Sequence, residues 1–364
     1  MTGTGAQVLT PEWLTSALSP LLGDVRVGSV ACAPVGTGQM SDCVRLIPTY
    51  DGPTAAPRSM IAKLPAADAT SRATAAALRN YEIEVSFYRQ LAPQLPVRAP
   101  RCYHAHLDTT GTDFVLLLED VAPARQGDQL AGCSVDEAAV AVEELPRLHA
   151  PRWGDPSLAE LDWLHRSPAE AVDFTSQLVA GLYGGFCERY AGRVDADIMA
   201  LGERLMARLP SYLGDRRGPW TVAHGDFRLD NLLFGTAGPG GRPGETDGAG
   251  PPVVVVDWQT VTHGPGIGDL SYFLGAGLVP EARRSHEHDL VRAYHDALQA
   301  AGVVGLAWDD CWAQYRRYTF GGLIMAIAAS MLVEQTDRGD DMFVTMAQRH
   351  GRHAIDLEAE RLIH

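Results

Sequence analysis

The first third of the chain contains short, strand-like runs rich in apolar residues and separated by polar turn sequences, a pattern that predicts β-strands. These runs cover residues 25–35, 43–47, 59–64, 101–107 and 114–121. Two stretches have helical spacing instead. One follows the capping sequence Thr10-Pro11-Glu12, and the other covers residues 71–91. In the second stretch the apolar face consists of Leu78, Tyr81, Val85, Tyr88 and Leu91. The pattern predicts a β-rich region with one long helix.

From about residue 134 the spacing becomes predominantly helical, beginning with a predicted helix over 135–149. Short strand-like pieces interrupt it at 232–234 and 253–256, and 11 of the 18 residues between them (235–252) are Gly or Pro. That stretch is therefore predicted to be a mobile loop with no core of its own. The apolar run 321–333 is too short to span a bilayer and predicts a buried helix. We expect an α+β protein with a small lobe, 1–120, and a larger helical lobe, 121–364.

Charge and cysteine content narrow the class of protein. The 364 residues include 30 Lys and Arg against 45 Asp and Glu, a net charge of −15. Such a surface repels phosphate, so we expect neither a nucleic-acid nor an anionic-membrane partner, and any anionic ligand must be held by a few local groups. Six cysteines without a C-x-x-C pair argue against disulfides and zinc, and no secretory signal precedes the first predicted helix. These features predict a cytoplasmic protein.

Two polar motifs carry the strongest chemical signal. The first is His224-Gly225-Asp226-Phe227-Arg228-Leu229-Asp230-Asn231, and the second is the apolar strand 253–256 followed by Asp257-Trp258-Gln259. A carboxylate with an amide five residues later, and then a second carboxylate after a strand, suits phosphoryl transfer. One Asp orients the attacking hydroxyl, while the Asn and the other Asp hold Mg²⁺ on nucleotide phosphates.

These motifs resemble those of the aminoglycoside phosphotransferase and choline kinase superfamily. With Gly264-Pro265-Gly266 and the run 269–274, they are most similar to the ecdysteroid-kinase-like branch and its bacterial relatives. The resemblance implies a protein-kinase-like fold of two lobes and ATP-dependent phosphorylation of a small-molecule hydroxyl. It also implies that Asp226 is the catalytic base and that Asn231 and Asp257 bind Mg²⁺. Asp269 would anchor the backbone of the catalytic loop.

The resemblance assigns further residues to the nucleotide and its phosphates. Lys63, at the end of a predicted strand, would reach the phosphates and be oriented by a Glu on the next helix. Glu84 fits this role better than Glu82, because Glu84-Val85-Ser86-Phe87-Tyr88 matches the family wording. Arg228 stands where protein kinases place a phosphate-neutralising Lys.

Backbone groups complete the predicted nucleotide site. The hairpin Gly36-Thr37-Gly38-Gln39-Met40-Ser41 would cover the phosphates, with Gly36, Gly38 and Ser41 as its G-x-G-x-x-S residues. It lacks the G-K-[ST] ending of a P-loop. The strand exit at Glu119 and Val121 would supply the hinge that holds adenine.

Other interpretations stay open at this point. The same motifs could belong to a nucleotide-binding pseudokinase, or, less well, to a hydrolase with a carboxylate pair. The acidic residues Glu334, Asp337, Asp340 and Asp341 form either a solvated loop or a binding site for a cationic acceptor. Residues 284–289 resemble a metal motif, but Leu290 stands where H-E-x-x-H needs its second His, so a solvated helix start is predicted there. The acceptor alcohol and the oligomeric state are not set by these patterns.

Overall fold

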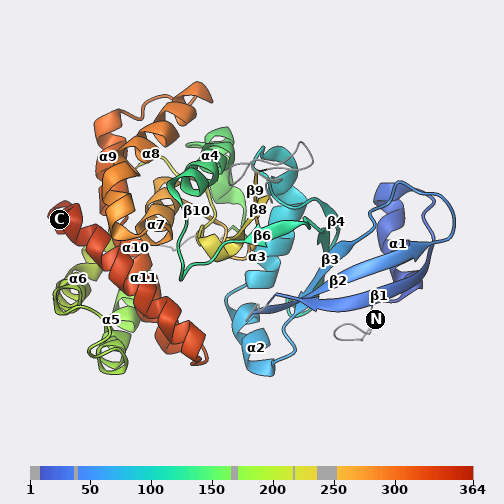
Figure 1. Cartoon of the computed structure of the whole chain (residues 1–364), viewed down its shortest axis with the longest axis horizontal. Helices are drawn as coiled ribbons and strands as arrows, with labels where there is room; N and C mark the ends of the chain where they lie inside the picture. Colours follow the sequence, from blue (N-terminus) through green and yellow to red (C-terminus); the bar gives the residue numbers. More distant parts are fainter. Residues whose placement is uncertain (1–8, 37–39, 165–170, 216–217, 236–251, 364) are drawn as a thin grey trace. The chain divides into compact units, whose positions relative to one another are not determined.

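The computed structural model describes residues 9–36, 40–164, 171–215, 218–235 and 252–363. The chain has a mixed α+β fold and divides into two compact units (Figure 1). Unit 1 comprises residues 1–124 and 254–261, and unit 2 comprises residues 125–253 and 262–364. Gly38 and almost all of the predicted Gly- and Pro-rich loop lie outside the described residues.

Unit 1 is organised around an antiparallel sheet of five strands in the order β1-β2-β3-β5-β4 (Figure 1). The strands are β1 (Val27–Val35), β2 (Ser41–Tyr50), β3 (Met60–Pro65), β4 (Cys102–Leu107) and β5 (Phe114–Glu119). β3 lies in the middle, with Lys63 opposite Cys43 on one side and Leu116 on the other. The buried centre of the sheet fixes the backbone that carries Lys63.

Helix α1 (Pro11–Leu22) covers part of this sheet, and its start follows the predicted capping pattern. The Thr10 side chain accepts a hydrogen bond from the backbone N–H of Trp13, and Pro11 occupies the first helical turn, where its missing N–H costs nothing. The apolar face of the helix joins one hydrophobic cluster with the sheet, formed by Leu14, Ala17, Leu18, Leu46, Met60, Ala62 and Leu117 among others.

The single long helix predicted over 71–91 is wrong, because the structure divides this stretch. Helix α2 (Ala69–Ala77) ends before Arg79, whose φ of 59° is left-handed, and helix α3 (Asn80–Ser86) then begins in a new direction. A π-helical turn, Phe87–Leu91, follows. The break leaves Leu78 56% exposed, whereas Tyr81, Val85, Tyr88 and Leu91 are buried as expected.

Unit 2 is mainly helical, with α11 packed against α10 and α6 (Figure 1). Its helices are α4 (Val135–His149), α5 (Ala171–Arg189), α6 (Ala196–Gly214), α7 (Ile267–Gly277), α8 (Pro280–Ala300), α9 (Trp308–Arg317), α10 (Phe320–Leu332) and α11 (Asp337–Asp356). The remaining short strands of the chain are β6 (Ala124–Gln126), β7 (Thr221–Ala223), β8 (Leu232–Gly235), β9 (Val253–Val255) and β10 (Thr262–Gly264). β7 and β10 pair antiparallel, and the motif 224–231 follows β7 directly.

The apolar run predicted as a buried helix is α10, which contributes Phe320, Leu323, Ala326 and Ile327 to the core of unit 2. In the described part of the chain, no helix has the length and apolar character needed to cross a membrane. The six cysteines all lie in that part, and all are free thiols.

Residues 284–289 lie inside α8, and the prediction of a solvated helix start is wrong for Glu287. This side chain is 5% exposed and accepts hydrogen bonds from the Arg283 guanidinium at 2.8 Å and the Tyr315 hydroxyl at 2.9 Å. A carboxylate is buried only when donors of this kind surround it. Tyr315 lies 28 residues further along the chain, so the local sequence could not reveal that Glu287 is buried.

A second buried ionisable group lies on α11. The imidazole of His350 is fully buried against the ring of Tyr272 and between Gly275 and Gly322, where a side chain at either glycine would overlap it. Burial lowers the pKa of His350 to about 3, so the ring is neutral at physiological pH.

This burial predicts a loss of stability in mild acid. In the unfolded chain His350 titrates near its usual pKa of about 6.5, so below that pH the unfolded state binds a proton that the folded state does not. Between pH 7 and pH 5 we expect this histidine to cost about 2 kcal/mol in the free energy of unfolding. Urea unfolding of His350→Leu at the two pH values should show a smaller loss than wild type. The control His286→Asn, at an exposed position of α8, should keep the wild-type loss. An unchanged loss in His350→Leu would contradict the assignment.

Candidate active site

The loop that follows β7 is fixed through its backbone. Asp269, near the start of α7, accepts hydrogen bonds from the N–H groups of His224 at 2.6 Å and Gly225 at 2.9 Å. The Asp269 side chain is 5% exposed, so these bonds are shielded from competition with water. The loop therefore presents Asp226 from a rigid support, as the sequence resemblance implied for Asp269.

A second layer of contacts holds Asp269 itself. The fully buried ring of His149, the last residue of α4, lies with Nε2 3.2 Å from Asp269 Oδ2 and Nδ1 2.8 Å from the Tyr294 hydroxyl. Thr221 donates its hydroxyl proton to the carbonyl of His149 at 2.6 Å. The local sequence around His149 gives no sign of this contact, because Asp269 lies 120 residues further along the chain.

The Asp226 carboxylate is surrounded by three donors. Its Oδ2 accepts from Arg228 Nε and Asn231 Nδ2, both at 3.0 Å, and its Oδ1 accepts from the Tyr272 hydroxyl at 3.1 Å. Asn231 also donates to the Asp226 carbonyl at 2.8 Å, so its side-chain amide orients both ends of the residue. The Asp226 side chain keeps 19% of its surface exposed, which leaves it accessible to a reacting group.

Arg228 is a cation held by two carboxylates of its own loop. Besides Asp226, its guanidinium donates to Asp230 Oδ2 at 2.7 Å and to the sulfur of Met342 at 3.3 Å. Burial alone would lower the pKa of Arg228, but the charges of Asp226 and Asp230 outweigh burial and raise it. The positive charge of Arg228 therefore lies directly beside the Asp226 carboxylate.

In unit 1, Lys63 lies between two carboxylates. Its Nζ donates to Glu84 Oε1 and to Asp257 Oδ1, each at 2.8 Å, and it is 7% exposed. Glu82 instead pairs with Arg79 on the surface of α3, at 2.9 Å. Lys63 is also the only lysine in the whole sequence.

Electrostatics keep this ammonium charged. Burial alone would lower the pKa of Lys63, but the carboxylates of Asp257 and Glu84 reverse that effect and raise it. Glu84 is buried to 1% exposure, and burial raises its pKa against the opposing charge of Lys63. Asp257 is the more open partner, because its side chain is 27% exposed. Its backbone has a left-handed φ of 65°, a conformation that Asp tolerates better than most residues.

The predicted phosphate-covering hairpin is described only at its ends. Gly36 closes β1 with φ of 77°, a left-handed conformation suited to glycine, and Ser41 opens β2 as a buried residue. The returning strand is tied to α3, because the Tyr81 hydroxyl donates to the carbonyl of Met40 at 2.8 Å. Gly38 lies outside the described residues.

Glu119 and Val121, the two predicted hinge residues, differ in their hydrogen bonds and in their place relative to β5. Glu119 uses its N–H on the carbonyl of Arg101 at 2.8 Å, and its carboxylate accepts from Arg98 at 2.6 Å and from the Arg101 N–H at 3.0 Å. These bonds belong to the end of the sheet. Val121 comes after the last residue of β5 and is half-buried.

The predicted metal ligands have suitable chemistry. Asp257 has two carboxylate oxygens. Asn231 donates its amide N–H groups to Asp226, and its side-chain oxygen is an acceptor. Oxygen donors of this kind are what Mg²⁺ prefers, together with phosphate oxygens and water. Among the residues described, no group of three His, Cys, Asp or Glu side chains forms a closed metal site. Each of the two residues, taken by itself, therefore has a side chain of the kind that Mg²⁺ accepts.

The acidic residues at the start of α11 are compensated by neighbours within unit 2. Asp340 accepts from the Tyr190 hydroxyl at 2.7 Å and from Gln335 at 2.6 Å, and Asp341 pairs with Arg193 at 2.6 Å. The bonds to Tyr190 and Arg193 hold the start of α11 against the segment that follows α5. The two carboxylates thus have structural roles of their own.

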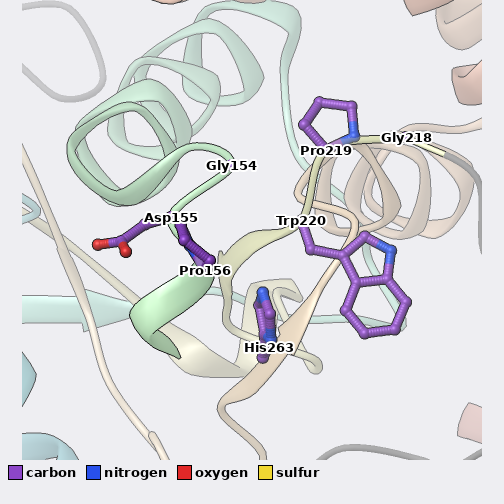
Figure 2. A pocket seen from close by; sticks show the side chains of 7 residues that line it. All are labelled: Gly154, Asp155, Pro156, Gly218, Pro219, Trp220 and His263. Atoms are coloured by element: carbon purple, nitrogen blue, oxygen red, sulfur yellow. The ribbon is translucent and has the colours of Figure 1, made fainter. Parts of the chain in front are cut away.

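A hollow of about 350 Å³ lies elsewhere in unit 2, beside the start of β7 (Figure 2). Figure 2 shows Trp220 and His263 on one side and Asp155 and Pro156 on another, with Gly154, Gly218 and Pro219 completing the lining. The two rings meet edge to face, with centroids 5.1 Å apart. None of the residues predicted to act in catalysis lines this hollow, so it is separate from the Asp226 loop.

Tyr272 is the functional candidate that sequence reasoning missed. It lies three residues after Asp269, which places both on one face of α7, the spacing that could have revealed it. In the sequence it reads as one more apolar residue of a buried helix, because the run 270–276 is almost entirely hydrophobic.

Comparison with known proteins confirms the predicted resemblance. The model of the ecdysteroid kinase-like family matches residues 169–302, which include the Asp226 loop, Asp257 and Asp269. No curated protein sequence is significantly similar to the chain.

Similar solved structures share the fold at low sequence identity. One, from Ralstonia eutropha, is assigned as an aminoglycoside phosphotransferase: it is 16% identical with a TM-score of 0.55, over 95% of this chain and 98% of that one. The choline kinase of Cryptosporidium parvum is 10% identical with a TM-score of 0.53, over 91% and 89%. The GDP complex of aminoglycoside 2'-phosphotransferase-IIIa is 13% identical with a TM-score of 0.50, over 93% and 98%.

The Lys63 cluster predicts a measurable change in amine reactivity. Removing the charge of Glu84 in Glu84→Gln lowers the pKa of Lys63, so more of the amine is neutral and nucleophilic. We expect its acylation by an amine-reactive reagent at pH 8 to rise about 10-fold, a change corresponding to one pKa unit. Peptide mass spectrometry reads this directly, because the chain has no other lysine. Glu82→Gln is the matched control and should leave the rate unchanged; equal acceleration in both variants would refute the pairing.

Proposed function

We propose that this protein is an ATP-dependent phosphotransferase that phosphorylates a hydroxyl group of a small molecule. The observation that carries the proposal is the rigid loop of unit 2, in which Asp269 holds the backbone while Asp226 keeps a partly exposed carboxylate. The fold shared with choline and aminoglycoside kinases and the match to the ecdysteroid kinase-like model support it. So does the Lys63 cluster of unit 1.

Unit 1 would bind the nucleotide. Lys63 would donate to phosphate oxygens, with Glu84 holding its ammonium in place, and Gly36 and Ser41 would bring backbone N–H groups of the hairpin to the phosphates. A guanine nucleotide is bound in one of the similar structures, so the base specificity of this chain is a matter for measurement. Of the two predicted hinge positions, Val121 is the better candidate to meet the base, because the Glu119 N–H is used within the sheet and Val121 follows the last residue of β5.

Unit 2 would activate the acceptor. The Asp226 carboxylate would accept a hydrogen bond from the acceptor hydroxyl and take its proton as the oxygen attacks the γ-phosphorus. Arg228 would keep Asp226 ionised before the transfer and offset negative charge during it. Asn231 would hold Asp226 in register through its two hydrogen bonds.

Magnesium would be held by the oxygens of Asp257 and Asn231. When bound, the ion would neutralise phosphate charge, the usual role of Mg²⁺ in this chemistry. Because Asp257 also accepts from Lys63, occupation of this carboxylate by a cation would weaken its hold on the ammonium and free Lys63 for phosphate.

Two features bear on the acceptor class. The net charge of −15 favours a cationic or neutral alcohol over an anionic one. The acids Asp340 and Asp341 are engaged by Tyr190 and Arg193, so they do not supply a ready site for an amine. A panel of aminoglycosides, macrolides, sterols, sugars and amino alcohols, screened by ADP release, would identify the class.

Removing the base should abolish transfer while sparing nucleotide binding. In Asp226→Asn we expect kcat for ADP release to fall about 10²- to 10⁴-fold, because the amide cannot accept the hydroxyl proton. The dissociation constant for nucleotide, measured by calorimetry, should change less than about threefold. Asp341→Asn is the control, a surface carboxylate paired with Arg193, and should keep wild-type turnover. Full activity in Asp226→Asn would exclude the proposed base.

Removing the acidic metal ligand should act on binding instead. We expect Asp257→Ala to lose the enhancement of ATP affinity by Mg²⁺, seen by calorimetry with and without the ion, while circular dichroism shows a folded protein. A wild-type chain that binds ATP and Mg²⁺ yet transfers phosphate to no acceptor in the panel would favour a nucleotide-binding pseudokinase.

A further inference from the structure

The inference concerns Tyr272, the third donor to the Asp226 carboxylate. Its hydroxyl donates to Oδ1 at 3.1 Å, and its ring is 9% exposed in the core of unit 2. The ring rests on His350, with centroids 5.2 Å apart. Packing on this side fixes the direction from which the hydroxyl reaches Asp226.

The two oxygens of Asp226 are not equivalent. Each carboxylate oxygen can accept about two hydrogen bonds, and Oδ2 already accepts two, from Arg228 and Asn231. Oδ1 accepts one, from Tyr272, and so keeps room for one more. A hydroxyl that approaches the carboxylate therefore finds its place on Oδ1, next to the Tyr272 phenol.

We propose that Tyr272 is a positioning residue that orients Asp226 so that Oδ1 is the oxygen receiving the acceptor proton. The inference rests on the proposed phosphotransferase function. It gives a role to Tyr272, a residue to which the sequence resemblance gave none. Tyr272 acts through Asp226 by fixing the carboxylate plane and one of the two acceptor positions on Oδ1.

The transfer step is then specific in its atoms. The acceptor O–H proton moves to Asp226 Oδ1 while the acceptor oxygen forms its bond to the γ-phosphorus of ATP. The bond from that phosphorus to the β,γ-bridging oxygen breaks, and ADP leaves with the electron pair. The proton on Oδ1 is lost to water after the product departs. Tyr272 keeps its own proton throughout.

The phenol is suited to this role because it stays a donor. Burial raises the pKa of Tyr272 well above its usual value, and the adjacent charge of Asp226 acts in the same direction. The neighbouring His350 is neutral, so the hydroxyl meets a carboxylate on one side and an uncharged ring on the other. A protonated phenol stabilises the ionised carboxylate without exchanging a proton with it.

Helix α7 gives Tyr272 a fixed relation to the rest of the loop. Asp269 holds the backbone at His224 and Gly225, and Tyr272, one turn later, holds the side chain of Asp226. The backbone of the loop and the carboxylate of Asp226 are thus both held by the same helix, α7.

The test is Tyr272→Phe, which removes the hydroxyl and keeps the ring packing. We expect kcat to fall on the order of 10-fold, as for loss of a hydrogen bond to a charged group, with the KM for ATP within about twofold of wild type. Tyr315→Phe is the matched control, since it removes a buried hydroxyl from Glu287 elsewhere in unit 2, and it should leave kcat and the KM for ATP unchanged.

A double-mutant cycle separates positioning from general damage. In an Asp226→Asn background, Tyr272→Phe should have almost no further effect on the residual rate, because its partner is already lost. Additive losses, or a wild-type kcat in Tyr272→Phe, would overturn the role of Tyr272 while leaving the phosphotransferase proposal intact. A wild-type protein without transfer to any acceptor would instead overturn the proposed function, and this inference with it.

Discussion

The candidate site of unit 2 depends on two hydrogen bonds, which the buried carboxylate of Asp269 accepts from backbone N–H groups. Asp269 takes up the N–H groups of His224 and Gly225, and those groups have to be satisfied because they are largely removed from water. His149 contacts Asp269 through one ring nitrogen, and Tyr294 bonds to the other ring nitrogen of His149. A layer of satisfied polar groups thus supports the loop, and the residues that would meet substrate are built on top of it.

The cluster of unit 1 solves a different problem, which is how to bury a cation in an acidic protein. Lys63 lies in the central strand of the sheet with two carboxylates within 3 Å, one buried on α3 and one on the segment after β9. Breaking such a group leaves an uncompensated buried charge and typically costs about 3–5 kcal/mol. All other cations of the chain are arginines, so the compact ammonium occurs at one place only.

Much of this was predictable from the sequence, and the failures have physical causes. The strands of unit 1, α4 and the buried α10 follow from periodicity and capping, and the similarity to kinases follows from the motifs after β7 and β9. The break at Arg79 did not follow, because a left-handed residue that is not glycine leaves no local signature. The roles of Tyr272 and Glu287 did not follow for a different reason. Their partners lie 46 and 28 residues away, and only the folded chain brings a polar partner to an apolar face or buries an acid.

Helix α7 carries Asp269 and Tyr272 one turn apart, and this has a consequence for motion. The helix cannot rotate or slide without pulling on two consecutive stretches of the same loop, first its main chain and then the carboxylate of Asp226. Any rearrangement of unit 2 that accompanies ligand entry must therefore carry loop and helix together as one body, or unwind the first turns of α7. We therefore expect substitutions that alter ligand preference to fall in the segments around α7 and not in the helix itself.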